Sequence, residues 1–217
     1  MRDNYSEQLL LLNKKMTELG ELCETVIELV TIALLAGDSK KAGEVQPIAQ
    51  RVDQLEREIE TFCLKLLLHQ QPVAGDLRQI SAALKMITDM ERIGDQAEDI
   101  AEIIPFLKGR TGVWCEDINN MAYAVIQMVR ESVQSYVNQD VELAKKVVAQ
   151  DDVVDEYFDK VKSSLIQMIL QNISEGEYAL DLLMIAKYFE RIGDHAVNIA
   201  EWTEFTVTGF HEEELDK

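Results

Sequence analysis

The stretch that decides the fold is residues 80–104, which read ISAALKMITDMERIGDQAEDIAEII. Its apolar and small residues recur at steps of three and four, the spacing at which side chains return to one face of an α-helix. They form one continuous stripe: Ile80, Ala83, Leu84, Ile87, Met90, Gly94, Ala97, Ala101 and Ile104. The stretch therefore predicts a long helix with one face turned toward a core.

The same period runs through almost the whole chain on either side of this stretch. We predict helices over 5–36, 39–69, 75–104, 114–137, 141–171 and 176–207. Pro47 lies inside the second of these, so that helix should kink or start as two segments. The segment Gly37-Asp38-Ser39 closes the first helix and can cap the second, and Ser174 with Glu177 has the spacing of a capping box before the last one.

The chain also repeats itself. Residues 91–102 recur 99 positions later as residues 190–201, with nine of twelve positions identical. A weaker register of 102 positions relates residues 52–53 to residues 154–155. Because short turns make neighbouring helices antiparallel, the predicted fold is all-α: two tandem antiparallel three-helix bundles with six long helices. The repeats span residues 1–108 and 109–217 and are joined side by side or end to end.

The charge of the chain narrows the classes of partner. It carries 40 acidic and 21 basic side chains, a net charge of −19. Such a surface repels nucleic-acid backbones and attracts metal cations and basic protein surfaces. The three cysteines are far apart, which disfavours a disulfide framework or a structural zinc site. No apolar stretch is long enough to span a membrane and no signal peptide is visible, so we expect a cytoplasmic protein without membrane insertion.

Two sets of acidic residues could hold a cation. Glu91 and Asp95 are four residues apart and share a helix face, and Glu190 with Asp194 repeats the pair. In an antiparallel hairpin, residues at one height have a constant sum of positions, so the preceding helix adds further carboxylates at each height. The candidate metal ligands are Asp53, Glu91 and Asp95 in the first repeat, and Asp151, Asp155, Glu190 and Asp194 in the second.

The first set has three carboxylates because Ala49 stands where the match to Asp151 would be. We therefore expect a cation to bind the second set first. Carboxylates alone suit hard cations such as Mg²⁺, Mn²⁺, Ca²⁺ or Fe³⁺, whereas Zn²⁺ prefers nitrogen or sulfur. His195 should point about 100° away from Asp194 around the helix. The alternative is two solvated acidic faces, with Arg92 paired to Asp95 and Arg191 paired to Asp194.

The sequence gives little support for an enzymatic function. It contains no dinucleotide-binding glycine motif, no P-loop and no His-Glu-x-x-His zinc motif. A di-iron bundle enzyme needs Glu-x-x-His on two helices, but Leu66, Ile192 and Thr208 stand three residues before the histidines. Gly94 and Gly193, with the alanines that follow them, are better explained as places where helices pack closely. We expect a non-enzymatic protein.

At three places the chain resembles the PhoU family, the accessory regulators of bacterial phosphate uptake. These are QPVAGDLR at 71–78, ERIGD at 91–95 and ERIGDHAVNIAE at 190–201. The resemblance implies an adaptor that acts with the ATPase subunit of a phosphate ABC transporter and with a phosphate-sensing histidine kinase, repressing the phosphate-starvation response. We expect a homodimer as well.

Some family members carry multinuclear metal clusters on paired acid-x-x-x-acid motifs. The resemblance therefore implies a cluster of iron, zinc, manganese or magnesium on Glu91 with Asp95, on Glu190 with Asp194 and on Asp151 with Asp155, while the motif of Asp53 is incomplete because Ala49 stands where its partner acid would be. The alternative to the adaptor is a metal-binding bundle with storage or metal-dependent chemistry at these carboxylates.

Overall fold

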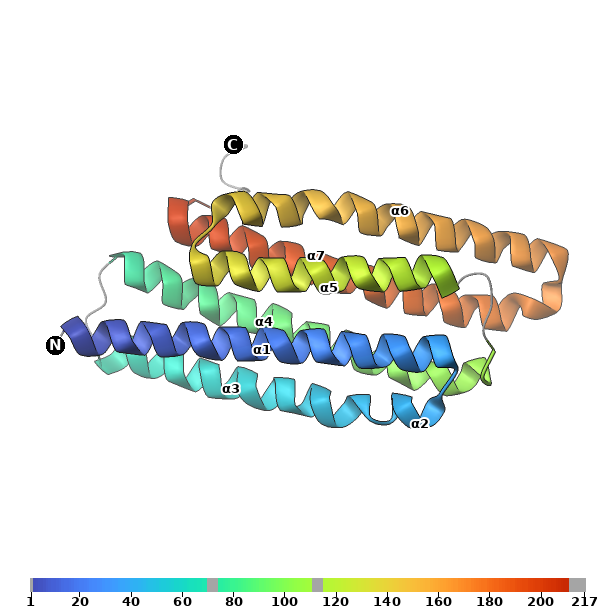
Figure 1. Ribbon diagram of the computed structural model, residues 1–217, viewed down its shortest axis with the longest axis horizontal. Helices are drawn as coiled ribbons and strands as arrows, with labels where there is room; N and C mark the ends of the chain where they lie inside the picture. Colours follow the sequence, from blue (N-terminus) through green and yellow to red (C-terminus); the bar gives the residue numbers. More distant parts are fainter. Residues whose placement is uncertain (1, 70–73, 111–114, 211–217) are drawn as a thin grey trace.

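The computed structural model describes residues 2–69, 74–110 and 115–210. Its long elements are helices that lie nearly along one axis (Figure 1). The α-helices are α1 (Arg2–Ala36), α2 (Ser39–Ala42), α3 (Val45–His69), α4 (Ala74–Ile103), α5 (Cys115–Asn138), α6 (Val141–Gln171) and α7 (Gly176–Thr208). Two 3₁₀ turns follow α4 and α6, η1 (Ile104–Leu107) and η2 (Ile173–Glu175). The all-α fold with six long helices is confirmed, while residues 71–73 of the QPVAGDLR stretch and the predicted helix start at residue 114 lie outside the described residues.

The helices form two three-helix bundles that lie side by side. Helices α1, α3 and α4 pack together in the first, and α5, α6 and α7 in the second. The two bundles meet through α4 against α7 and α1 against α5, which leaves α3 and α6 on the outside (Figure 1). The end-to-end arrangement is therefore excluded. None of the described helices combines the length and apolarity that a bilayer crossing requires.

The predicted break near Pro47 is confirmed. The second predicted helix starts as the short α2, whose N-cap Asp38 accepts hydrogen bonds from the backbone N–H groups of Lys40 and Lys41. Pro47 then falls in the first turn of α3, where its missing N–H leaves no helical hydrogen bond unmade. Just before α2, Gly37 has a φ of 62°, and a Cβ there would lie 2.8 Å from the Cα of Gly109. Only glycine fits this left-handed, closely approached position.

The second repeat starts its outer helix in the same way. Asp140, 102 positions after Asp38, caps α6 by accepting a hydrogen bond from the Leu143 N–H at 3.0 Å. The capping box predicted before α7 is wrong. The amide oxygen of Asn172 accepts hydrogen bonds from the backbone N–H of Ser174, at 3.1 Å, and from its hydroxyl, at 2.7 Å. Ser174 thus belongs to η2, and α7 begins after Glu175 without a side-chain cap.

The small residues of α4 and α7 allow close helix packing, as predicted. A Cβ at Gly94 would lie 3.3 Å from Val52 on α3, and one at Gly193 would lie 3.5 Å from Val154 on α6. Each contact joins two residues that the sum of positions places at the same height of the hairpin. The contacts therefore confirm the antiparallel register inferred from the turn positions. Between the bundles, the fully buried Tyr136 donates a hydrogen bond to the carbonyl of Gln79 on α4 at 3.1 Å. The register fixes where the carboxylates lie.

Candidate functional site

The first set of carboxylates comes together across α3 and α4. Asp53 on α3 and Glu91 and Asp95 on α4 each offer one oxygen, and these three oxygens lie within 4.8 Å of one another. We call this group cluster one. In the part of the chain that the structure describes, no other trio of His, Cys, Asp or Glu side chains meets that distance. Cluster one is therefore the compact group.

Arginines offset part of the charge of cluster one. Arg92 pairs with Asp95 at 2.9 Å and with Glu91 at 3.6 Å. Partial burial and then the nearby Asp95 nevertheless raise the pKa of Asp53 above its ordinary value, although Arg57 opposes the shift. The same two causes raise the pKa of Glu91, against Arg92. The nearby arginines thus offset only part of the repulsion among the three carboxylates.

The second set lies at the matching height of the other bundle. Asp151 and Asp155 on α6 face Glu190 and Asp194 on α7, and we call these four residues cluster two. Burial, followed by the charges of Asp155, Asp194 and Glu190, raises the pKa of Asp151 from 3.8 to about 6. The Oδ1 atom of Asp151 is buried without a hydrogen-bond partner. Such an oxygen costs free energy unless a proton or a cation meets it.

One lysine offsets the charge of cluster two. Lys187 forms an ion pair with Glu190, whose side chain is largely buried. The pairing of Arg191 with Asp194 that the solvated-face alternative expects is not among the ion pairs of the described residues. Arg191 instead lies toward α4, where it opposes the rise in the pKa of Asp99 that burial and Glu102 cause. The expected pairing of Arg92 with Asp95 is confirmed for the first repeat alone.

His195 lies at the junction of the two bundles rather than in cluster two. Its Nδ1 lies 2.9 Å from Oδ1 of Asp89 on α4, and Asn198 donates to the same oxygen at 3.0 Å. This agrees with the expected rotation away from Asp194. Asp89 was missed by the sequence reasoning, because no repeat or spacing connects it to a residue 106 positions away. The contact ties α4 to α7 beside both clusters.

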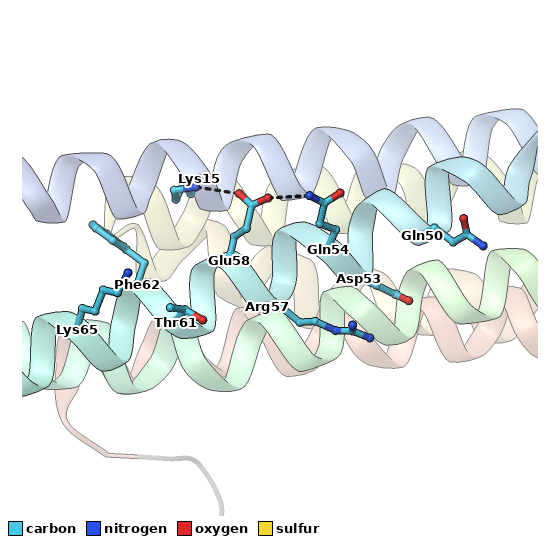
Figure 2. Close-up of a pocket in the computed structure, with 9 residues that line it drawn as sticks. All are labelled: Lys15, Gln50, Asp53, Gln54, Arg57, Glu58, Thr61, Phe62 and Lys65. Atoms are coloured by element: carbon cyan, nitrogen blue, oxygen red, sulfur yellow. Dashed lines mark hydrogen bonds and ion pairs between the residues drawn. The ribbon is translucent and has the colours of Figure 1, made fainter.

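A groove of about 740 Å³ runs along α3 next to cluster one (Figure 2). Its lining residues are Lys15, Gln50, Asp53, Gln54, Arg57, Glu58, Thr61, Phe62 and Lys65. Glu58 accepts hydrogen bonds from Lys15 at 3.4 Å and from Gln54 at 3.3 Å, as the dashed lines in Figure 2 show. The groove thus mixes acidic and basic side chains, of which Lys15 and Glu58 form an ion pair, and Asp53 is part of its lining.

Comparison with known proteins identifies the repeat. The family model of the PhoU domain matches twice, over residues 16–104 and 118–203. A phosphate-specific transport system accessory protein PhoU homolog of Clostridium acetobutylicum is 32% identical over 91% of this chain and 91% of its own length. A protein of the same description from Aquifex aeolicus is 36% identical over 82% of this chain and 81% of its own.

Solved structures agree with the arrangement of the helices. The crystal structure of PhoU from Pseudomonas aeruginosa has a TM-score of 0.89 at 29% identity, over 95% of this chain and 100% of that one. A phosphate transport system regulatory protein PhoU from Streptococcus pneumoniae shares the fold, with a TM-score of 0.86 at 21% identity, over 95% of this chain and 98% of that one. With two matched domains, relatives of its own length and the same six-helix arrangement, this chain belongs to the PhoU family.

Proposed function

We propose that this protein is a non-enzymatic accessory regulator of phosphate-specific transport. The observation that carries the proposal is the match of the PhoU domain to both repeats, together with relatives named as accessory proteins of that transport system. The match spans both bundles and includes the helices that hold the two clusters. The role in phosphate transport thus rests on the whole fold rather than on one motif.

The finer proposal is that of an adaptor in the cytoplasm. It binds the ATPase subunit of a phosphate ABC transporter and a phosphate-sensing histidine kinase, and it represses the phosphate-starvation response when phosphate is plentiful. The net charge of −19 supports binding through basic surfaces of these partners, since an acidic surface steers positive patches toward it. A homodimer remains a prediction, which sedimentation velocity of the purified protein tests directly.

The acidic residues fit a hard divalent or trivalent cation. Cluster one places three oxygens within 4.8 Å, and cluster two contains a buried oxygen without a partner. Carboxylate oxygens are the ligands that magnesium, manganese and ferric iron prefer. Zinc fits less well, because no cysteine and no histidine nitrogen belongs to either described cluster. Asp53, Glu91 and Asp95 would hold one site, and Asp151, Asp155, Glu190 and Asp194 the other.

A bound cation would supply charge neutralisation. In cluster one it would hold α3 against α4, and in cluster two α6 against α7, at the heights where the helices already pack closely. This same geometry favours the second candidate function, a metal-binding bundle with storage or metal-dependent chemistry. The two candidates differ in what they need, since the adaptor needs a protein partner and the storage bundle does not.

A pull-down from cells grown with and without phosphate separates the two. The tagged chain, expressed at its natural level, should recover the transporter ATPase above a tag-only control. Recovery should fall in buffers of high ionic strength, because salt screens the attraction between an acidic and a basic surface. Absence of the ATPase in both growth conditions, with metal co-purifying in both, contradicts the adaptor and favours the metal-binding bundle.

A further inference from the structure

Several large apolar side chains are exposed to solvent at the end of the α6–α7 hairpin where the two helices are connected. Figure 1 shows this end extending beyond the start of α5. Ile166 and Leu170 on α6 are 48% and 74% exposed, Ile173 in the turn is 87% exposed, and Leu180 and Met184 on α7 are 59% and 46% exposed. We call residues 163–186 the second tip. Large apolar side chains gathered in this way are typical of an interaction surface.

These side chains share the face that carries cluster two. Ile166 follows Asp155 by 11 positions and Leu180 precedes Asp194 by 14, spacings that return to within about 20–40° on a helix. The register confirmed at Gly193 and Val154 puts Ile166 level with Asp181, beside Leu180. The four-residue spacings within each helix add Leu170 and Met184 to the same surface. One apolar face therefore covers the end of the hairpin, and Lys162 and Lys187 lie between it and cluster two, paired with Asp159 and Glu190.

On the side of the turn, the charge around this face has one sign. The second tip contains Glu175, Glu177 and Asp181 but no lysine or arginine. Glu175 is already paired, with Arg110. Burial and the neighbouring Glu177 raise the pKa of Asp181, so these two carboxylates lie close together without a compensating cation. On the side of the turn, the border is thus negative, because Glu177 and Asp181 add two charges that no lysine or arginine of the second tip offsets.

The matching end of the first repeat differs in its charge and in the apolar surface of its second helix. Residues 61–87, which we call the first tip, contain Lys65, Arg78 and Lys85 against one acid, Asp76. Its α3 keeps exposed apolar side chains at the matched positions, Leu64 and Leu68. On α4, Leu77 is 45% exposed, but Ser81 and Lys85 stand where the second repeat has Leu180 and Met184. The combination of a longer apolar face on both helices and acidic borders belongs to the second tip.

We propose that the second tip binds a basic amphipathic helix of a protein partner. Its apolar stripe would cover Ile166, Leu170, Leu180 and Met184, and its lysines or arginines would meet Glu177 and Asp181, as in helix-in-groove recognition. A second tip from another copy of this chain is the poorer occupant, because it would bring a second Glu177 and Asp181 against this acidic border. The inference rests on the proposed adaptor function and names the surface and partner chemistry it uses.

A labelled peptide tests the surface directly. The probe is a helical peptide of lysines and leucines, with the leucines at i, i+3, i+4 and i+7, and its control has glutamate in place of lysine. Fluorescence anisotropy with the full-length protein should show binding of the basic peptide only. Ile166→Ser with Leu170→Ser should weaken that binding about tenfold or more. The matched control, Leu64→Ser with Leu68→Ser, should change it by less than about twofold.

Other outcomes overturn the inference. If the wild type does not bind the basic peptide, the second tip is not a docking surface for such a helix. If both double variants lose the same affinity, the peptide is attracted only by the overall negative charge of the protein. Sedimentation velocity that shows self-association abolished by the Ile166 and Leu170 substitutions assigns the surface to a second copy instead. The proposed function fails separately, when even the wild-type protein does not restore repression to a strain that lacks it. If the wild type and both variants restore it equally, the function stands and the second tip is not its docking surface.

Discussion

The two repeats place acidic residues at the same height but hold them differently. Cluster one has three carboxylates packed within 4.8 Å, with Arg92 paired to two of them. Cluster two has four, with Lys187 paired to one and a buried oxygen of Asp151 left without a partner. The difference in the number of carboxylates traces to one position, since Ala49 is 3% exposed in the core where the second repeat has Asp151. The same position of the fold thus holds an uncharged residue in the first repeat and a carboxylate in the second.

The junction between the bundles breaks the symmetry again. His195 pairs with Asp89, whereas Gln96, the residue matched to His195, is buried and its amide oxygen has no partner. Tyr188 occupies the position matched to Asp89. The repeat thus keeps its packing glycines, Gly94 and Gly193, and its acid pairs, but it differs at the positions of Asp151 and His195. Substitutions that exchange these differences between repeats test whether they matter.

The largest effect should come from placing the missing acid in the first repeat. Ala49→Asp buries a carboxylate beside the core and near three others, so we expect a loss of about 3 kcal/mol in the free energy of unfolding at pH 7. Ala49→Asn, which has the same size without the charge, should lose less. Urea unfolding of the metal-free proteins measures both. Equal stability of the two variants contradicts the assignment of charge repulsion to this position.

Cations should stabilise the protein, and cluster two should account for most of the effect. At a cation concentration near 100 Kd, binding adds about 2.7 kcal/mol, which raises the Tm of a chain of this size by about 5–10 °C. Glu190→Ala with Asp194→Ala should remove most of the shift seen with Mg²⁺ or Mn²⁺, and Glu91→Ala with Asp95→Ala should remove less. Thermal unfolding after chelator treatment is the measurement. A wild type unaffected by any cation tested means that both clusters are solvated acidic faces.

A smaller, pH-dependent effect follows from Asp151. Its pKa is raised from 3.8 to about 6 in the folded protein, so the folded state holds this proton more tightly than the unfolded state does. The group therefore costs stability as the pH rises through that window, and the cost is absent below pH 3.8. Asp151→Ala should stabilise the metal-free protein by about 1 kcal/mol at pH 7.5, after allowance for solvent screening.

The control for Asp151→Ala is Asp152→Ala, which makes the same change at an exposed neighbour whose charge contributes least to the raised pKa of Asp151. Unfolding in urea at pH 7.5 and below pH 4 separates the charge from helix propensity, because propensity does not depend on pH. If the two variants differ from wild type by the same amount at both pH values, the repulsion in cluster two is too weak to matter.

Much of this arrangement could be read from the sequence. The period of three and four residues located six helices, and the repeat with constant position sums placed Asp53 beside Glu91 and Asp151 beside Glu190. These inferences succeed because hairpin geometry depends on short-range spacing. The pairing of α4 with α7, the contact between Asp89 and His195, and the displaced cap at Ser174 were not predicted. They depend on side-chain contacts between distant segments or on competition for one hydrogen bond, which spacing does not encode.

The most direct measurement is expression of a phosphate-starvation reporter in phosphate-rich medium. In a strain that lacks this protein and any paralogue, the reporter should stay on, and the wild-type protein should switch it off. Returning the cluster-one and cluster-two double variants to the same strain shows which repeat the regulation needs. Normal repression in the strain that lacks the protein contradicts the proposed role, whatever the clusters bind.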